Sequence, residues 1–350
     1  MPKEPQGPKR RECVEDRARF YEFMRLNSFL MFARMMVVGI VLATPVAAQA
    51  PVLVSDGVIA LPNTGGRIDH MAADVGRKRL FVAELGNGTM DVVDLVAGKV
   101  INRVTGLKEP QGIAYEPRSD RVAVAGGGDG ALHLYAAADF APRGVVALGD
   151  DADNVRVDGR NGHIVVGYGE GALAVIDPVN SEILGQIKLP GHPESFRLAG
   201  SNVFINVPDT RQIIVADLDA LKIEVVWKQE ALHSNFPLML DNHGHVAVVF
   251  RVPARLVLFD AASGKQVAAA DTCGDSDDLF FDSRRERFYV SCGQGVVDVF
   301  AAGGLARLGR VATRSGGRTS LFVPELDRLY VAERAGMLGA VAQIAVLKPQ

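Results

Sequence analysis

Acidic side chains recur at one position of a sequence repeat in this 350-residue chain, and they are the first candidates for a functional site. The residues at that position are Asp69, Gln111, Asp153, Glu194, Phe236, Asp277 and Arg318, spaced by 42, 42, 41, 42, 41 and 41 residues. The next position adds His70, Gly112, Asn154, Ser195, Pro237, Asp278 and Thr319. Carboxylate and amide oxygens are ligands that hard divalent cations prefer, so a metal site is one possible use of these residues.

Two interpretations of these acids remain open. If Asp69, Asp153, Glu194 and Asp277 converge, they raise one another's pKa and could bind a divalent metal or a cationic ligand. With a bound cation, the protein could be a metal-dependent hydrolase of the gluconolactonase type. The cation would polarise the substrate carbonyl, and Asp277 would act as the base. In the other interpretation, which we favour, they are solvated acids that end strands and accept backbone hydrogen bonds, with Arg318 neutralising part of their charge.

Other motifs have structural explanations. Gly167-x-Gly169-x-x-Ala172 joins two expected strands, whereas a dinucleotide fingerprint requires a strand followed by a helix, so we expect a hairpin turn. His243-Gly244-His245 is expected in a surface turn on the face opposite the acids. The acidic stretches 150–154 and 275–278 lack the glycine and terminal glutamate spacing of an EF-hand loop. No Gly-x-Ser-x-Gly elbow occurs, and no catalytic residue is predicted.

The spacing of these candidates comes from a repeat that runs through residues 51–350. Its clearest element is a short apolar strand, found at 80–84, 122–126, 164–168, 203–207, 246–250, 288–292 and 329–333. Three further short segments accompany it in the first six repeats and two in the seventh, separated by turns containing Gly, Asn or Asp. Four antiparallel strands in each of seven repeats predict an all-β fold, a seven-bladed β-propeller.

The last repeat ends without a fourth strand. The N-terminal stretch 56–66 resembles the fourth-strand stretch before the seventh repeat, 309–317. We therefore predict that the N-terminal strand completes the last blade and closes the ring, which removes an exposed strand edge.

The repeated phrases resemble those of the YVTN-repeat family of bacterial β-propellers. The first-strand phrase at 108–117 (KEPQGIAYEP) and the second strands LFVAE (80–84) and LYVAE (329–333) carry the resemblance, which covers residues 51–350. These motifs are structural, so the resemblance implies a fold and an exported location rather than an activity. The Gly-His and Trp-Asp pairs of WD-repeat proteins are absent, and the single Trp227 does not fit the Trp-rich quinone-dependent dehydrogenases.

The first 50 residues are expected to be an N-terminal extension and a signal peptide. An apolar run at 35–48 follows Arg25 and Arg34 and precedes the small-residue site Ala48-Gln49-Ala50. Its cleavage would leave residues 51–350 as a single periplasmic or secreted domain. Cys273 and Cys292 would be the only remaining cysteines, free to form a disulfide or to remain buried thiols.

The expected function is binding rather than catalysis. We predict a binding or scaffold module whose loop face binds a protein partner or a small ligand. The module is expected to be a monomer, and it would associate with a membrane only if the signal peptide were not cleaved. Removing residues 1–50 changes the formal charge from −3 to −6, since eight Lys or Arg residues and five acids are lost. An acidic chain without a basic cluster is a poor partner for nucleic acid. No cofactor is predicted beyond a possible divalent cation.

Overall fold

A computed structural model describes residues 50–336 and 339–350 of the chain. The expected signal segment, Cys13 and the rest of the first 49 residues lie outside the described residues. Within the described part, no helix has the length and apolar character needed to cross a membrane.

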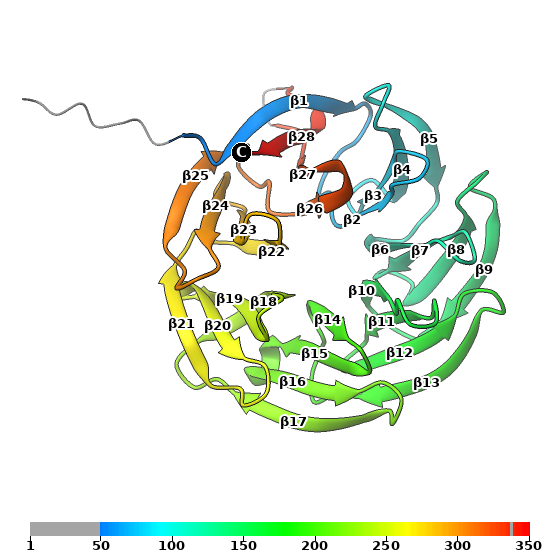
Figure 1. Cartoon of the computed structure of the whole chain (residues 1–350). Helices are drawn as coiled ribbons and strands as arrows, with labels where there is room; N and C mark the ends of the chain where they lie inside the picture. The colour runs from blue at the N-terminus through cyan, green and yellow to red at the C-terminus, as the bar shows by residue number, and fades with distance from the viewer. Residues whose placement is uncertain (1–49, 337–338) are drawn as a thin grey trace, which may run out of the picture. The chain divides into compact units, whose positions relative to one another are not determined.

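Seven four-stranded antiparallel sheets are arranged as a ring, so the predicted seven-bladed β-propeller is confirmed (Figure 1). Blade 1 contains β2 (Met71–Asp74), β3 (Arg79–Glu84), β4 (Thr89–Asp94) and β5 (Lys99–Thr105). Blade 2 contains β6 (Pro110–Glu116), β7 (Arg121–Gly126), β8 (Ala131–Ala136) and β9 (Pro142–Ala147). Blade 3 contains β10 (Ala152–Val157), β11 (Ile164–Tyr168), β12 (Ala172–Asp177) and β13 (Glu182–Lys188).

The remaining blades follow the same order. Blade 4 contains β14 (Phe196–Ala199), β15 (Asn202–Val207), β16 (Gln212–Asp217) and β17 (Lys222–Lys228), with the 3-10 helix η1 (Pro208–Thr210) in one turn. Blade 5 contains β18 (His233–Leu240), β19 (His245–Val252), β20 (Ala254–Asp260) and β21 (Gln266–Asp271). Blade 6 contains β22 (Ser276–Asp282), β23 (Arg287–Cys292), β24 (Val296–Ala301) and β25 (Arg307–Ala312). Blade 7 contains β26 (Ser320–Val323), the 3-10 helix η2 (Pro324–Leu326), β27 (Arg328–Glu333), β28 (Ala342–Pro349) and β1 (Leu53–Leu61).

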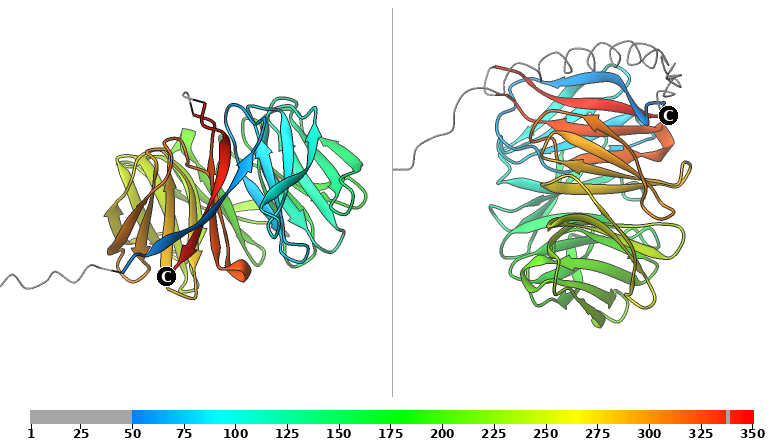
Figure 2. Two further views of the ribbon diagram at one scale, coloured as in Figure 1. Left: turned by 90° about the horizontal axis from the view of Figure 1, so that it is seen from above. Right: turned by 90° about the vertical axis from the view of Figure 1, so that its left-hand side faces the viewer.

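The N-terminal strand closes the ring, as predicted. β1 pairs antiparallel with β28, with a register running from Leu53 opposite Pro349 to Leu61 opposite Ala342. Figure 1 and both views of Figure 2 show the two strands side by side in one blade. Pairing the first strand with the last makes the ring continuous through hydrogen bonds that join the two ends of the repeat array.

Apolar side chains fill the spaces between neighbouring blades. Alternate residues of a strand point to opposite faces of its sheet, so the middle strands, covered on both faces, are apolar throughout. In β3, for example, Leu80 and Val82 pack against blade 7, whereas Phe81 and Ala83 pack against blade 2. The fourth strands are largely exposed at the periphery. This packing holds the seven first strands around a central channel.

Charged turn residues join adjacent blades on one face. The turn after β2 places Arg77 2.7 Å from Asp120 of blade 2. The equivalent turn of blade 3 places Arg160 2.9 Å from Asp219 of blade 4. Because this face carries the ends of the first strands, it is opposite the channel mouth at which those strands begin. His243 also lies here, exposed and paired with Glu286 at 2.5 Å, as expected for a surface turn.

Candidate functional site

The channel mouth carries the charged residues that the repeat spacing singled out. β-bulges occur at the mouth end of four first strands, shifting the register between Pro110 and Ile113, Ala152 and Val155, Asn235 and Leu238, and Ser276 and Asp278. A bulge inserts one extra residue and changes the direction of the side chains around it. Gln111, Asp153, Phe236 and Asp277 lie within these bulges. In the other three blades the equivalent residues Asp69, Glu194 and Arg318 precede first strands that have no bulge.

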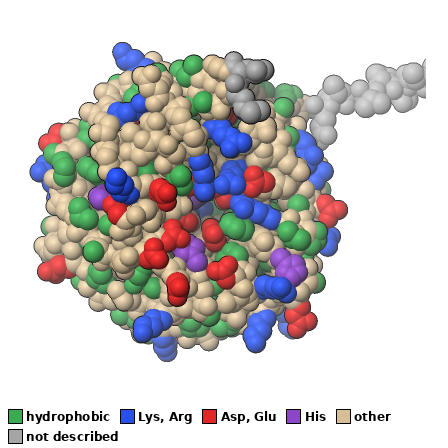
Figure 3. Space-filling view, turned by 180° about the vertical axis from the view of Figure 1, so that it is seen from behind, with side chains coloured by type: hydrophobic (Ala, Val, Ile, Leu, Met, Phe, Trp, Pro, Cys, Tyr) green, Lys and Arg blue, Asp and Glu red, His purple; other side chains and the backbone are tan. Residues whose placement is uncertain are grey.

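Acidic side chains gather on one side of the centre of the mouth face and arginines on the other (Figure 3). Asp69, Asp275 and Asp277 lie among the arginines and form ion pairs with them. We define the acidic sector as Asp151, Asp153 and Glu194 of blades 3 and 4. The arginine sector consists of Arg67, Arg251, Arg318 and Arg334, on blades 1, 5, 6 and 7 and the segments that join them. Arg67, Arg318 and Arg334, with Asp275, line a hollow of about 130 Å³.

Asp277 is held by two arginines. Its Oδ1 lies 2.6 Å from an Arg251 Nη2, and its Oδ2 lies 3.1 Å from the Arg318 Nε. The Arg251 guanidinium also stacks 3.6 Å above the ring centroid of Phe236, which occupies the equivalent mouth position of blade 5. Arg251 and Arg318 thus place positive charge beside both oxygens of Asp277, although its buried Oδ2 accepts no hydrogen bond from a described residue.

Asp69 and Glu194 are less well paired. The Asp69 carboxylate is 1% exposed and lies 2.8 Å from Arg67, but neither of its oxygens accepts a hydrogen bond. Burial raises its pKa to about 6, against the lowering effect of His70 and Arg67. Burial, reinforced by Asp153 and Asp277, raises the pKa of Glu194 to about 8. Glu194 therefore carries a proton over part of the neutral range.

His192 was not among the residues selected from the sequence, yet it lies within the acidic sector. Its Nδ1 lies 2.6 Å from the carbonyl oxygen of Gly169, and its Nε2 lies 3.9 Å from Asp153 Oδ2. Its pKa is raised to about 9 because the contacts with Asp153 and the Gly169 carbonyl outweigh burial. Gln111 donates a hydrogen bond to Asp151 over 3.1 Å and so belongs to the same network.

The described residues do not provide a set of metal ligands. In residues 50–336 and 339–350, no three His, Cys, Asp or Glu side chains gather closely enough to hold one ion. Cations of the protein already contact Asp69, Asp153 and Asp277. No observation in this part of the molecule favours the metal-dependent hydrolase.

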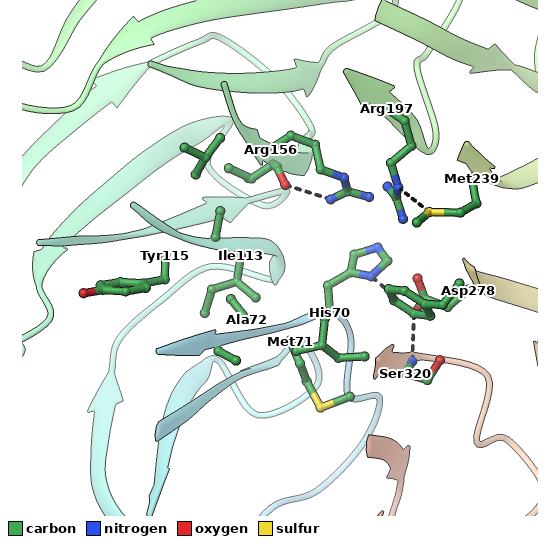
Figure 4. A pocket seen from close by; sticks show the side chains of 16 residues that line it. His70, Met71, Ala72, Ile113, Tyr115, Arg156, Arg197, Met239, Asp278 and Ser320 are labelled. Atoms are coloured by element: carbon green, nitrogen blue, oxygen red, sulfur yellow. Dashed lines mark hydrogen bonds and ion pairs between the residues drawn. The ribbon is translucent and has the colours of Figure 1, made fainter. Parts of the chain in front are cut away.

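A second layer of candidates lies inside the channel, in a cavity of about 310 Å³ (Figure 4). His70 Nδ1 lies 3.6 Å from Asp278 Oδ2, and the same oxygen accepts a hydrogen bond from the backbone N–H of Ser320 at 2.8 Å. Contact with Asp278 raises the pKa of His70 to about 10 and lowers that of Asp278, against the effect of burial on each. Both groups are therefore charged at neutral pH. Asn154, 2% exposed, accepts a hydrogen bond from Arg156.

Two arginines of this cavity were missed in the sequence. The position two residues before each first-strand end carries Ala72, Ala114, Arg156, Arg197, Met239, Phe280 and Leu321, and all seven line the cavity. Arg156 and Arg197 are the only charged residues among them. The other five repeats have an apolar residue at this position. The sequence could therefore have revealed both arginines as charged exceptions to the repeat.

Cys273 and Cys292 form a disulfide between adjacent blades on the mouth side, with a Cα–Cα distance of 5.9 Å. Gly169 and Gly171 lie in the turn between β11 and β12, so the glycine motif forms a hairpin rather than a dinucleotide site.

Comparison with known proteins identifies the fold alone. No protein-family model matches the chain, and no curated protein matches its sequence significantly. A chain in the crystal structure of a mitotic checkpoint complex superposes with a TM-score of 0.71 over 86% of this chain and 94% of that chain, at 12% sequence identity. At this level of identity the likeness concerns the fold and not the function.

Proposed function

We propose that the protein is an exported binding module that recognises a protein or peptide at its channel mouth. The observation that carries this proposal is the division of the mouth into an acidic sector and an arginine sector on a rigid ring of blades. A matching partner would present a basic side chain to Asp153 and Glu194, and a carboxylate to Arg67, Arg318 and Arg334. Complementary charges of this kind favour specificity and fast association.

Two further features support this assignment. Glu194 makes no side-chain hydrogen bond or ion pair with another described residue, although it lies close enough to Asp153 and Asp277 for both to raise its pKa. A partner's ammonium or guanidinium group would relieve that repulsion. The similar chain from the mitotic checkpoint complex belongs to a protein assembly, which agrees with a role in protein interaction.

The test is a comparative capture experiment from the native host, with tagged wild-type chain and two double variants. Asp153→Asn with Glu194→Gln neutralises the acidic sector, and Asp219→Asn with Glu286→Gln makes the matched change on the opposite face. We expect at least one protein to be enriched by the wild type and the opposite-face variant but reduced at least tenfold by the mouth variant. The purified partner should bind more weakly as salt increases. Equal capture by all three chains would disprove the proposal.

The exported location is part of the same proposal and rests on the sequence at 25–50 and its likeness to YVTN-repeat propellers. Cell fractionation and N-terminal sequencing of the chain from its host provide the test. We expect an N-terminus close to residue 51 in the exported fraction. A chain retained in the cytoplasm with residues 1–50 attached would disprove export without affecting the mouth.

A further inference from the structure

The channel cavity contains more positive charge than its own residues neutralise. The guanidinium groups of Arg156 and Arg197 point toward each other, and the His70 imidazole lies beside them (Figure 4). Asp278 is the one carboxylate among the residues that line this cavity. Three cations and one acid therefore line the cavity, because His70 is protonated at neutral pH through its contact with Asp278. From the mouth, Asp69 lies 3.9 Å from His70 and Asp153 raises the pKa of Arg156, but neither carboxylate lines the cavity.

The two arginines use few of their donors. Arg156 donates to the carbonyl of Val155 at 2.7 Å and to Asn154 Oδ1 at 3.0 Å. Arg197 donates through Nη1 to the carbonyl of Phe196 at 3.0 Å and to the Ser195 hydroxyl at 3.4 Å. Its Nε donates to the sulfur of Met239 at 3.3 Å, and its Nη2 forms no hydrogen bond with a described residue. No carboxylate of the described chain forms an ion pair with either group. A guanidinium has five N–H donors, so several from each arginine remain for another acceptor.

Two buried guanidinium groups without an anionic partner are energetically unfavourable. Burial lowers the pKa of both arginines, and the charge of Arg156 lowers that of Arg197 further. Buried charges in proteins are normally paired with an opposite charge. An anion between the two guanidiniums would provide that pair.

Apart from the two arginines, His70, Asp278, Tyr115 and Ser320, the residues that line the cavity are apolar. Ala72, Ala114, Met239, Phe280 and Leu321 complete the ring of residues at the level of the two arginines. The cavity volume of about 310 Å³ lies at the lower end of the range for small-molecule sites. A planar carboxylate matches the two-donor geometry of a guanidinium, and an apolar group attached to it would contact these side chains.

We propose that the channel binds a small monocarboxylate, with its carboxylate between Arg156 and Arg197 and its short apolar body against the Met239, Phe280 and Leu321 side of the ring. This site lies beneath the mouth and does not depend on the partner proposed there.

The test is calorimetric titration of the purified propeller with acetate, butyrate, hexanoate and benzoate, with inorganic phosphate as the anion that lacks an apolar body. We expect one site per chain and a dissociation constant that falls by up to about fourfold for each added methylene until the cavity is full. Arg156→Met and Arg197→Met should each weaken butyrate binding at least tenfold. Arg118→Met, on the opposite face and bonded only to backbone carbonyls, should leave it unchanged.

Other results would overturn the proposal. Absence of saturable binding by every carboxylate would exclude the site, and equal binding by the wild type and both arginine variants would place it elsewhere. Tighter binding of phosphate than of any carboxylate would identify an inorganic-anion site instead. Thermal melting serves as the control for misfolding of the variants. Both methionine variants should be at least as stable as the ligand-free wild type, because each removes a buried charge. The mouth variant D153N/E194Q retains both arginines, so the two proposals can fail separately.

Discussion

His70 Nδ1 lies 3.6 Å from Asp278 Oδ2, so an ion pair links blade 1 to blade 6 at the channel. The pKa of His70 is raised from 6.5 to about 10, mainly because contact with Asp278 outweighs burial. A raised pKa in the folded state means that the protonated imidazole stabilises the fold. This stabilisation is complete below pH 6.5 and is lost as pH rises through about 10.

His70→Gln should therefore lower the free energy of unfolding at pH 6 by up to about 4 kcal/mol, and by much less at pH 10.5. Urea titrations of both chains at the two pH values provide the measurement. His163→Gln, which alters a histidine in a turn on the opposite face, is the control. A destabilisation by His70→Gln that is the same at both pH values would show that the ion pair does not depend on protonation.

Glu194 should show the pH dependence of a buried acid. Its pKa is raised to about 8, so its contribution to stability is present below pH 4.5 and is lost as pH rises through about 8. Glu194→Gln should accordingly increase the free energy of unfolding at pH 9 by about 1 to 3 kcal/mol and have little effect at pH 4.5. Carbon-13 NMR of the Glu194 carboxyl would give the pKa directly. A value near 4.5, or the same gain from the exposed Glu230→Gln, would contradict this prediction.

Arg103 should be essential for closing the ring. It contacts the buried Asp91 through Nε at 2.6 Å and Nη2 at 2.7 Å, and it donates to the carbonyls of Pro62 and Asn63, just after β1. Arg103→Met leaves the Asp91 carboxylate buried without its partner, so we expect a loss of about 3 to 5 kcal/mol in unfolding free energy.

The matched control is Arg310→Met in blade 6, since Arg310 contacts the buried Asp298 through Nε and Nη2 but forms no hydrogen bond or ion pair with the described residues of the N-terminal segment. Asp298 also lies 3.5 Å from Arg307, so the loss of stability should be smaller in this variant. Both variants should be destabilised, but only Arg103→Met should increase hydrogen exchange in 53–61. Equal exchange of that strand in the two variants would show that Arg103 does not support closure.

The disulfide should contribute directly to stability. It joins Cys273 and Cys292, which are 19 residues apart, and a loop of this length gives about 3 kcal/mol in the chain-entropy model. Cys273→Ala with Cys292→Ala should lower the unfolding free energy by about that amount, and added reductant should have no further effect on this variant. Thiol labelling of the unreduced propeller, residues 51–350, should detect no free cysteine. Two labelled thiols per chain would show that the bond does not form.

The sequence by itself determined the architecture of the ring. The second strands recur every 39 to 43 residues with turn residues between them. This local pattern defines the number of blades, the order of strands and the closing role of the N-terminal stretch 56–66, which overlaps β1. Such features are readable because strand alternation and turn chemistry depend on residues close together in the chain. The same spacing also showed that Asp69, Asp153, Glu194 and Asp277 belong to one end of the channel.

The tertiary structure decided which of these charges meet. Arg251 pairs with Asp277, yet it comes from the second strand of blade 5 and not from either of the mouth positions that the repeat spacing selected. Arg156 and Arg197 lie three residues beyond the mouth positions and face the cavity because their strands converge there. Contacts across the channel join residues as far apart as His70 and Asp278, and they depend on bulges, rotamers and the width of the ring. Those are properties of the assembled blades. Repeat spacing alone could therefore show which residues lie at the same level of the channel, but it could not show which charged side chains form ion pairs.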